Sequence, residues 1–449
     1  MIRQLSITGY TNITDTWRKK AALRGIEAEI RYCGELIVRD VTRKLYILTI
    51  LTLGTQAIEI PGIPFSLFQI MIMLTGFMSV LAVLKERYYG LHQNLAFAVV
   101  ELLSCGAAFS LSTFPSWAKS SLLVGIMTSM MIVFIPHFFG REDLARLERA
   151  LIRSQYIAVP FSVYTYYMFY YRGGLPERIR LFLGMYITLD SDFIRRAQAS
   201  GHVRLALPFA TPPVLSVVMG ICLVLLLMNR NLFRQEIRIS LMGIFAVILG
   251  FTGSRAGVMA VAITLLLFAP KRLKRSRLKR IHVSWIFITG LLGLGILYVA
   301  AHNFAYIAKF SSRYSISFLL QDRHLLLLIE CVRIWFRSLE NFLFGIGFGS
   351  SIHMQGSLTN LGPYFFNSYL TLAVERGILG MYLAFSLIKM GLHALKQRKS
   401  RSADEFAMAA AAVAALASCL FYEVFHCYFF VIVIAVYYVI YNERTGKAQ

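Results

Sequence analysis

The chain has 449 residues, of which 57% are hydrophobic and 15% are charged, and its formal net charge is +23. Soluble globular proteins are about 45–50% apolar and about 25% charged, so this composition excludes an ordinary soluble domain. Repeated apolar stretches close to the roughly 20 residues that cross a bilayer predict a multi-pass membrane protein. Because the sequence lacks period-2 alternation, we expect an all-α bundle of transmembrane helices.

The apolar runs predict about twelve transmembrane helices, of which the first, seventh and eighth are short. In chain order they cover residues 45–58, 62–84, 91–113, 119–139, 154–171, 206–228, 239–253, 256–270, 282–301, 368–391, 406–422 and 426–441. The chain then divides into a basic tail at 1–44, a transmembrane domain at 45–441 and a short tail at 442–449. Two long outside connections remain, at 172–205 and 302–367.

Basic residues between the predicted spans indicate how the chain is oriented. They gather in the N-terminal tail and at 85–87, 141–153, 230–238, 271–280 and 396–401. All of these segments fall on one side, so the positive-inside rule predicts that both termini are cytoplasmic. The run KRLKRSRLKR at 271–280 is then an orientation signal and a possible contact for anionic membrane lipid. A nucleic-acid partner is not expected, since no soluble domain surrounds this run.

Neither the cysteines nor the carboxylates predict a metal or another cofactor. The six cysteines are scattered and form no CxxC pair, which argues against a zinc site and a disulfide framework. Asp190 and Asp192 have the spacing of an Asp-x-Asp metal motif, but their stretch is expected to be a loop or a helix cap. We therefore expect chemistry that needs no metal ion.

The two outer loops carry many basic residues for an outside location, and almost all are arginine. Loop 172–205 has no lysine, and its arginines are Arg172, Arg178, Arg180, Arg195, Arg196 and Arg204. Loop 302–367 has the lysine Lys309 and the arginines Arg313, Arg323, Arg333 and Arg337. A planar guanidinium binds phosphate oxygens in a bidentate manner, so these arginines indicate an anion site. The alternative is that each of them reaches lipid headgroups.

The stretch ILGFTGSRAGVMAVAIT at 248–264 places Arg255 between two apolar runs. Arg255 is expected on the tight outer turn between the seventh and eighth spans. Gly253 and Gly257 let the backbone turn and let another group approach closely. The free amides of the helix that begins here add positive potential for an anion. We therefore expect Arg255 to face a phosphate-bearing ligand outside the membrane.

The segment RHLLLLIECVRIWFR at 323–337, in the second outer loop, has the spacing of an amphipathic helix. One face carries Arg323, Glu330, Arg333 and Arg337. Apolar residues cover much of the rest. The helix is expected either as a roof over the anion site or as a plain interfacial helix on the outer leaflet.

Three segments of the C-terminal half together resemble the O-antigen ligase and polymerase superfamily of bacterial envelope glycosyltransferases. They are TGSR at 252–255, ENFLFGIGFGS at 340–350 and FNSYLTLAVERGILG at 366–380. The resemblance implies a metal-independent, inverting glycosyltransferase of the GT-C type in the bacterial inner membrane. It also implies a donor glycan on undecaprenyl diphosphate and an active site on the periplasmic side.

By this resemblance, Arg255 and an arginine of the first outer loop contact the diphosphate, and Arg204 is the first choice for the latter. The expected diphosphate-binding residues are Arg255, Arg204, Arg195, Arg196, Arg313 and Arg323, with Ser254 and Asn367 in support. Of these, Arg255 and Arg204 are expected to act in catalysis. The expected partners are the lipid-linked donor, a glycan acceptor, membrane lipid and a chain-length regulator.

The chain departs from the family where the pattern often has His-Asn and this sequence has Phe366-Asn367. In the ligases that histidine is the proposed base for the acceptor hydroxyl, and phenylalanine cannot accept a proton. Polymerase is therefore the better interpretation. The candidate bases are His353 and Glu375. Glu375 is equally expected to form an ion pair with Arg376 or with a neighbouring arginine.

Other titratable residues in or near the predicted spans are also candidates, because intramembrane charges are commonly functional. Glu101, near the middle of the third span, is a candidate partner for a buried arginine. Glu423 and His426 lie at the outer hairpin between the last two spans.

Two other functions stay open. One is an O-antigen ligase, which transfers the glycan onto lipid A-core. The other is a transporter, such as a flippase for lipid-linked oligosaccharide. A transporter is expected to keep charged or broken helices near the bilayer midplane at repeat-related positions. Charge in this sequence instead collects at one face and in two unequal outer loops.

Overall fold

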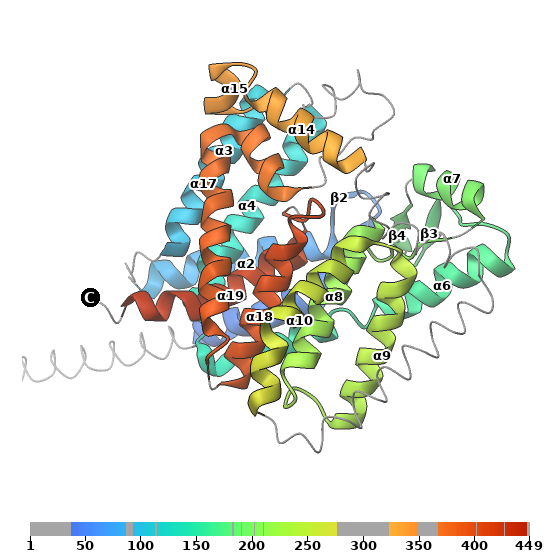
Figure 1. Ribbon diagram of the computed structural model, residues 1–449, viewed down its shortest axis with the longest axis horizontal. Coiled ribbons are helices and arrows are strands. Elements are labelled where there is room, and N and C mark those ends of the chain that lie inside the picture. The colour runs from blue at the N-terminus through green and yellow to red at the C-terminus, as the bar shows by residue number, and fades with distance from the viewer. Residues whose placement is uncertain are drawn as a thin grey trace, which may run out of the picture.

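The structure is a computed structural model, and most of its described part is helical (Figure 1). It describes residues 37–86, 93–112, 115–181, 184–189, 191–201, 203–209, 211–275, 323–348, 367–400, 402–425 and 427–446. Among these residues, five helices are long and apolar enough to cross a membrane. They are α2 (Leu67–Glu86), α3 (Gln93–Leu111), α4 (Pro115–Phe138), α9 (Gln235–Thr252) and α17 (Ser368–Gln397). This agrees with the expected helical, multi-pass membrane protein.

Further helices complete the bundle. They are the helical residues 37–51, α6 (Ala158–Tyr171), α8 (Pro212–Met228), α10 (Arg255–Arg275), α18 (Ala403–Ser418) and α19 (Tyr428–Gly446). The second outer loop contributes α14 (Arg323–Trp335) and α15 (Leu339–Phe344). The span expected at 282–301 lies outside the described residues.

Helices α18 and α19 form the centre of the bundle. Figure 1 shows them between α8, α9 and α10 on one side and α3, α4 and α17 on the other. Residues 408–412 of α18, a methionine followed by four alanines, have no exposed surface. Because alanine side chains are small, neighbouring helix backbones can approach closely at this run. The alanine run therefore lets α18 pack against α8, α10, α17 and α19 at once.

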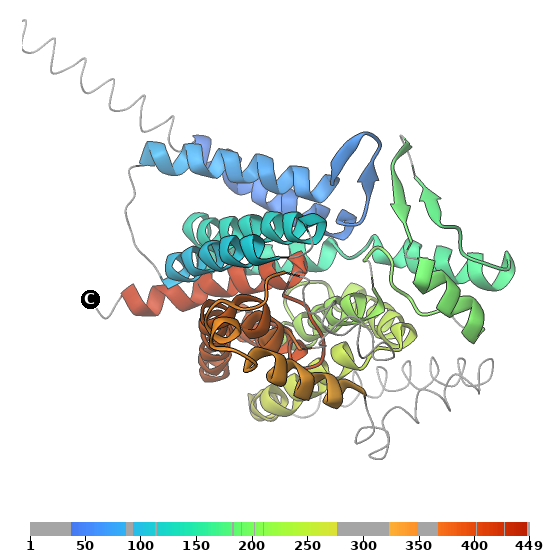
Figure 2. The same cartoon turned by 90° about the horizontal axis from the view of Figure 1, so that it is seen from above.

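A small antiparallel sheet at one end of the bundle was not predicted. Its strands are β1 (Glu59–Ile60), β2 (Ile63–Ser66), β3 (Arg178–Arg180) and β4 (Tyr186–Thr188), in the order β2-β1-β4-β3. β1 pairs with β4, so the sheet joins the connection before α2 to the loop after α6. Figure 2 shows these hairpins projecting beyond the helices. The sheet means that the fold is not the purely helical one that was expected. Its strands have only two to four residues, which is too short for period-2 alternation to be visible in the sequence.

A polar network lies at the opposite end of the bundle, around α5 (Leu144–Arg153). Arg141 and Glu405 form an ion pair at 2.9 Å. The side-chain amide of Asn229 donates to Glu148 at 2.9 Å and also to Asp404. Burial raises the pKa of the Glu148 carboxyl well above its usual value, and the nearby Asp404 carboxylate raises it further. Glu148 is thus a buried carboxyl whose partner is an amide rather than an arginine.

Candidate functional site

Helix α17 is interrupted within its first third. Gly377 has φ +58° and ψ −139°, which lies outside the helical region, so the helix breaks there. The segment that follows α15 fills the break. The Ile346 N–H donates to the Val374 carbonyl at 2.9 Å. The Gly347 N–H donates to the Glu375 carbonyl at 3.1 Å, so both carbonyls keep a partner where the helical ladder stops.

Two glycines permit this close contact. A Cβ atom on Gly345 would lie 2.4 Å from the carbonyl oxygen of Glu375. A Cβ atom on Gly377 would lie 2.3 Å from the carbonyl oxygen of Leu343. Both glycines also have positive φ angles, which residues with side chains rarely adopt. The segments ENFLFGIGFGS and FNSYLTLAVERGILG therefore form one packed unit over the part that the structure describes.

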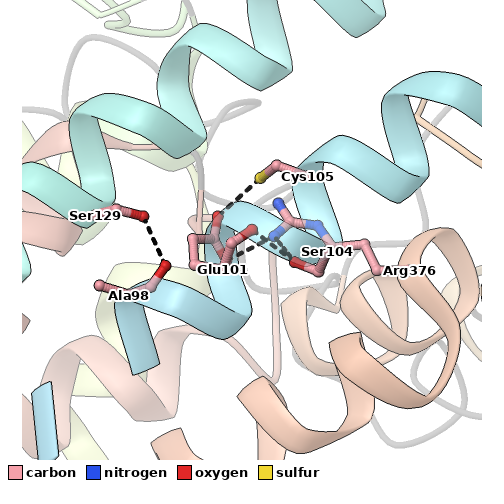
Figure 3. Close-up of polar contacts among 6 residues, drawn as sticks. All are labelled: Ala98, Glu101, Ser104, Cys105, Ser129 and Arg376. Atoms are coloured by element: carbon pink, nitrogen blue, oxygen red, sulfur yellow. Dashed lines mark hydrogen bonds and ion pairs between the residues drawn. The ribbon is translucent and has the colours of Figure 1, made fainter. Parts of the chain in front are cut away.

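Directly before the break, Arg376 pairs with Glu101 of α3 (Figure 3). Its Nη1 atom lies 2.6 Å from Glu101 Oε2 and donates to Ser104 Oγ at 3.2 Å. The Cys105 thiol donates to the other Glu101 oxygen at 3.3 Å. Both side chains of the pair are only 1% exposed. An ion pair that is withdrawn from solvent at this depth ties α3 to α17 and is a candidate functional feature.

The guanidinium of Arg376 is paired on one side only. Its Nε and Nη2 atoms are buried and have no hydrogen-bond partner among the described residues. The rings of Phe348 and Phe425 lie 5.0 Å and 5.5 Å from the guanidinium carbon, so cation–π attraction offsets part of the cost of burial. Nε and Nη2 carry the parallel N–H groups that bind a carboxylate or phosphate in a bidentate manner. A bidentate donor is thus unused in this state.

The connection between α18 and α19 brings Glu423 to the same place. Burial and the Glu375 carboxylate raise the pKa of the Glu423 carboxyl, the Arg376 guanidinium lowers it, and together they bring it to about 8. Burial also raises the pKa of the Cys331 thiol of α14, and Glu375 and Glu423 add to that rise. The amphipathic helix α14 therefore packs close to both carboxylates. We refer to Arg376, Glu101, Glu375 and Glu423 as the Arg376 cluster.

The structure places Arg204 and Arg255 at one turn, residues 252–255, which we call the TGSR turn. Gly253 ends α9 with φ +56°, and α10 begins at Arg255. Arg204 Nε donates to the Thr252 carbonyl at 2.8 Å, and its Nη2 donates to the Gly253 carbonyl at 3.1 Å. Arg204 therefore caps the carbonyl end of α9, where positive charge is favourable. Its guanidinium holds the turn that presents Arg255.

Small residues fix the TGSR turn against α8. Ser216 Oγ accepts the Gly257 N–H at 2.9 Å and donates to the Ser254 carbonyl at 3.3 Å. A Cβ atom on Gly257 would lie 2.1 Å from the Ser216 carbonyl oxygen. The helices α8 and α10 thus meet backbone to backbone. Buried Ser254 supports this contact through its main chain.

Asn367 caps the start of α17. Its side-chain oxygen accepts the Leu370 N–H at 3.1 Å, as an N-cap residue does. Its amide donates to the Leu420 carbonyl at 3.3 Å. Asn367 therefore fixes the first turn of α17 against the α18–α19 connection.

The remaining predicted site residues are placed only in part. Arg195 is exposed on α7 (Ser191–Ser200). Arg196 and Arg323 lie in helices α7 and α14, but their side chains are outside the described part. The residues that lie wholly outside it are Arg313, His353, Phe366 and His426. No three His, Cys, Asp or Glu side chains gather as metal ligands in the part that is described, and a metal-free reaction stays a prediction.

Sequence reasoning found the ion pair of Arg376 only in part. The sequence predicts a buried arginine partner for Glu101, but it assigns Arg376 to its neighbour Glu375. The two members of the pair are 275 residues apart. The available signal was a single acidic side chain in the span of α3 and the adjacent charges of Glu375 and Arg376 in the span of α17.

Comparison of the chain with protein-family models, with curated proteins and with solved structures found no match in any of the three. Support for a function therefore comes from this chain's own residues.

Proposed function

We propose that this chain is a glycosyltransferase of the bacterial inner membrane, with about twelve spans, a GT-C-like fold and both termini in the cytoplasm. It polymerises undecaprenyl-diphosphate-linked oligosaccharide repeat units into O-antigen or a related surface polysaccharide on the periplasmic side. The observation that carries this proposal is the packed unit of the two motif segments around the break at Gly377. The two segments, which are separated in the chain by residues 351–365, pack together there beside a buried arginine.

The TGSR turn provides the second support. Departure of the lipid diphosphate from the anomeric carbon builds negative charge on the leaving phosphate. A preorganised cation stabilises that charge more in the transition state than in the ground state. Arg255, at the N-terminus of α10, contacts the diphosphate, and Arg204 holds the turn by binding the carbonyls of Thr252 and Gly253. Losing one such contact typically costs about 2.7–4 kcal/mol of transition-state stabilisation.

An O-antigen ligase is the second enzyme candidate. The phenylalanine at position 366, which cannot act as a base, favours polymerase over ligase. A ligase transfers the finished glycan to lipid A-core, so the two activities differ in the acceptor and in the intermediate that accumulates when the protein is missing.

A lipid-linked oligosaccharide transporter is the remaining alternative, and one specific observation supports it. Transporters often bind their cargo at discontinuous helices near the bilayer midplane. Helix α17 is discontinuous at Gly377, and Glu101 lies near the middle of the span Asn94–Leu111. The buried pair of Glu101 with Arg376 is of the kind that marks ion or substrate pathways.

Deletion of the gene, followed by analysis of the surface glycan and of the lipid-linked intermediates, separates these functions. A polymerase predicts single repeat units attached to their outer acceptor or carrier. Long glycan stranded on undecaprenyl diphosphate would indicate a ligase. Repeat units confined to the cytoplasmic leaflet would indicate a transporter. Surface glycan of normal length and amount would overturn all three.

A further inference from the structure

The α18–α19 connection is fastened to the start of α17 by hydrogen bonds on both sides of Glu423. Ser368 Oγ donates to the Tyr422 carbonyl at 3.0 Å and accepts the Val424 N–H at 2.8 Å. The Ser368 N–H donates to the Cys419 carbonyl at 2.9 Å. The backbone around Glu423 is therefore fixed although it lies in a connection. A side chain on such a segment keeps a defined position, as proton transfer requires.

The same connection also reaches the TGSR turn through α8. The Tyr422 hydroxyl donates to Thr211 Oγ1 at 3.5 Å, and Thr211 is the residue from which α8 starts. Just over one turn further along α8, Ser216 holds Ser254 and the N-terminus of α10. The connection that carries Glu423 thus contacts both the start of α17 and the start of α8.

The connection lies beside Arg376, whose guanidinium carbon is 5.5 Å from the ring centroid of Phe425, and charged and titratable groups of α17, α14 and the connection itself act on Glu423. Helix α17 contributes Glu375 and Arg376, and α14 contributes Cys331. The connection itself contributes Cys419, whose thiol senses the Glu423 carboxylate. Behind these, Arg376 is already paired with Glu101 of α3. Glu423 is the only described carboxyl of this group that lies outside the membrane-spanning helices.

We propose that Glu423 is the general base that takes the proton from the acceptor hydroxyl during glycosyl transfer. This inference rests on the proposed glycosyltransferase function. In the step, the acceptor O–H bond breaks and its proton passes to the Glu423 carboxylate, while the acceptor oxygen forms the bond to the anomeric carbon. The bond from that carbon to the phosphate oxygen breaks, and its electron pair leaves with the diphosphate. Neutral Glu423 then releases the proton to water, so charge and atoms balance.

The electrostatics around Glu423 suit this role. A general base works best when its pKa lies near the operating pH. Burial and the Glu375 carboxylate bring the pKa of Glu423 to about 8, and the attraction of Arg376 keeps it from rising further. Glu423 is thus able to exchange a proton near neutral pH.

The test measures the pH dependence of chain elongation by the purified full-length protein. The substrate is the lipid-linked repeat unit extracted from the deletion strain. We expect the wild-type rate to rise with pH and to level off above an apparent pKa of about 8. Glu423→Gln is expected to lose about 100-fold or more in rate with an unchanged unfolding temperature. Glu423→Asp is expected to keep part of the rate with a displaced rising limb.

Glu236→Gln is the matched control, because Glu236 is an exposed carboxyl in the first turn of α9. It is expected to keep the wild-type rate and pH profile. A wild-type profile that is flat from about pH 6 to 9, or full activity in Glu423→Gln, would overturn the role of Glu423. Absence of elongation by the wild-type protein would instead count against the glycosyltransferase function itself, so the two failures are distinguishable.

Discussion

The TGSR turn and the Arg376 cluster both contain arginine side chains, but the surroundings of these side chains differ. At the turn, Arg204 satisfies the carbonyls that end α9, and Arg255 begins the next helix. In the cluster, Arg376 is 2% exposed and meets a carboxylate on one side and two aromatic rings on its faces. The first arrangement uses arginine to complete local backbone structure. The second uses it to join distant helices.

The difference predicts different consequences of substitution. A guanidinium that caps a helix end near the surface has water as an alternative partner, so its loss has a moderate cost. A buried guanidinium and its carboxylate have no such alternative, and removal of either leaves an uncompensated charge. The free energy of unfolding is therefore expected to depend far more on the Arg376 cluster than on the TGSR turn.

The largest effect is expected when the buried pair is broken on one side. Glu101→Gln leaves the Arg376 guanidinium buried without a carboxylate, which should lower the free energy of unfolding by about 3–5 kcal/mol. The double variant Glu101→Met/Arg376→Met removes both charges and should recover most of that loss. Thermal unfolding of the detergent-solubilised protein measures both.

The exposed pair of Glu330 with Arg333, at 3.8 Å, is the matched control. Glu330→Gln is expected to change the free energy of unfolding by at most about 1 kcal/mol. Equal losses in Glu101→Gln and Glu330→Gln would show that burial does not distinguish the two pairs.

The next largest effect concerns the break that positions Arg376. Gly377→Ala forces a Cβ atom to within 2.3 Å of the Leu343 carbonyl oxygen and imposes φ +58° on alanine. We expect a loss of about 1–3 kcal/mol, because the strained backbone and the loop contact cannot both persist. Gly106→Ala in α3 meets nothing within 4 Å and should be neutral or slightly stabilising. Similar melting temperatures for the two variants would contradict the tight fit at the break.

A smaller effect is expected at the TGSR turn. Arg204→Ala removes two hydrogen bonds to the Thr252 and Gly253 carbonyls, and because water can replace the lost donors it should cost about 0.5–1.5 kcal/mol. Arg149 of α5 also donates to a backbone carbonyl, of Ala145 at 3.0 Å, but in an exposed position. Arg149→Ala should therefore change the melting temperature little. If Arg149→Ala lowered the melting temperature more than Arg204→Ala, the proposed structural role of Arg204 at the turn would be contradicted.

The smallest effect is expected at Glu148, a buried carboxyl whose side-chain partner is an amide and not an arginine. The raised pKa of Glu148 means that folding favours its neutral form. The resulting stability is fully present below the ordinary pKa of 4.5 and is lost as the pH rises through the raised value. Glu148→Gln should therefore melt with less loss of stability between pH 5 and 8 than the wild type. Exposed Glu142→Gln should follow the wild-type curve, and a Glu148→Gln curve parallel to it would refute the assignment.

The sequence was informative where structure is local. Apolar runs predicted the long helices, and Gly253 with Arg255 predicted a tight turn, because each of these depends on neighbouring residues. The Arg376–Glu101 pair depends on which faces of α3 and α17 meet, and the pattern of apolar residues in two largely apolar helices does not determine this. The sheet escaped prediction because its strands are short and pair across more than 100 residues, as Glu59 does with Tyr186.

Chain elongation in proteoliposomes tests the proposed glycosyl transfer most directly. Purified full-length protein is mixed with lipid-linked repeat units from the deletion strain, and the products are separated by size. The wild type should form chains of several repeats, and Arg255→Ala should slow elongation by about 100- to 1,000-fold at an unchanged melting temperature, while Arg149→Ala keeps the full rate. Full-rate elongation by Arg255→Ala, or transfer of intact repeat units across the bilayer without any lengthening, would contradict it.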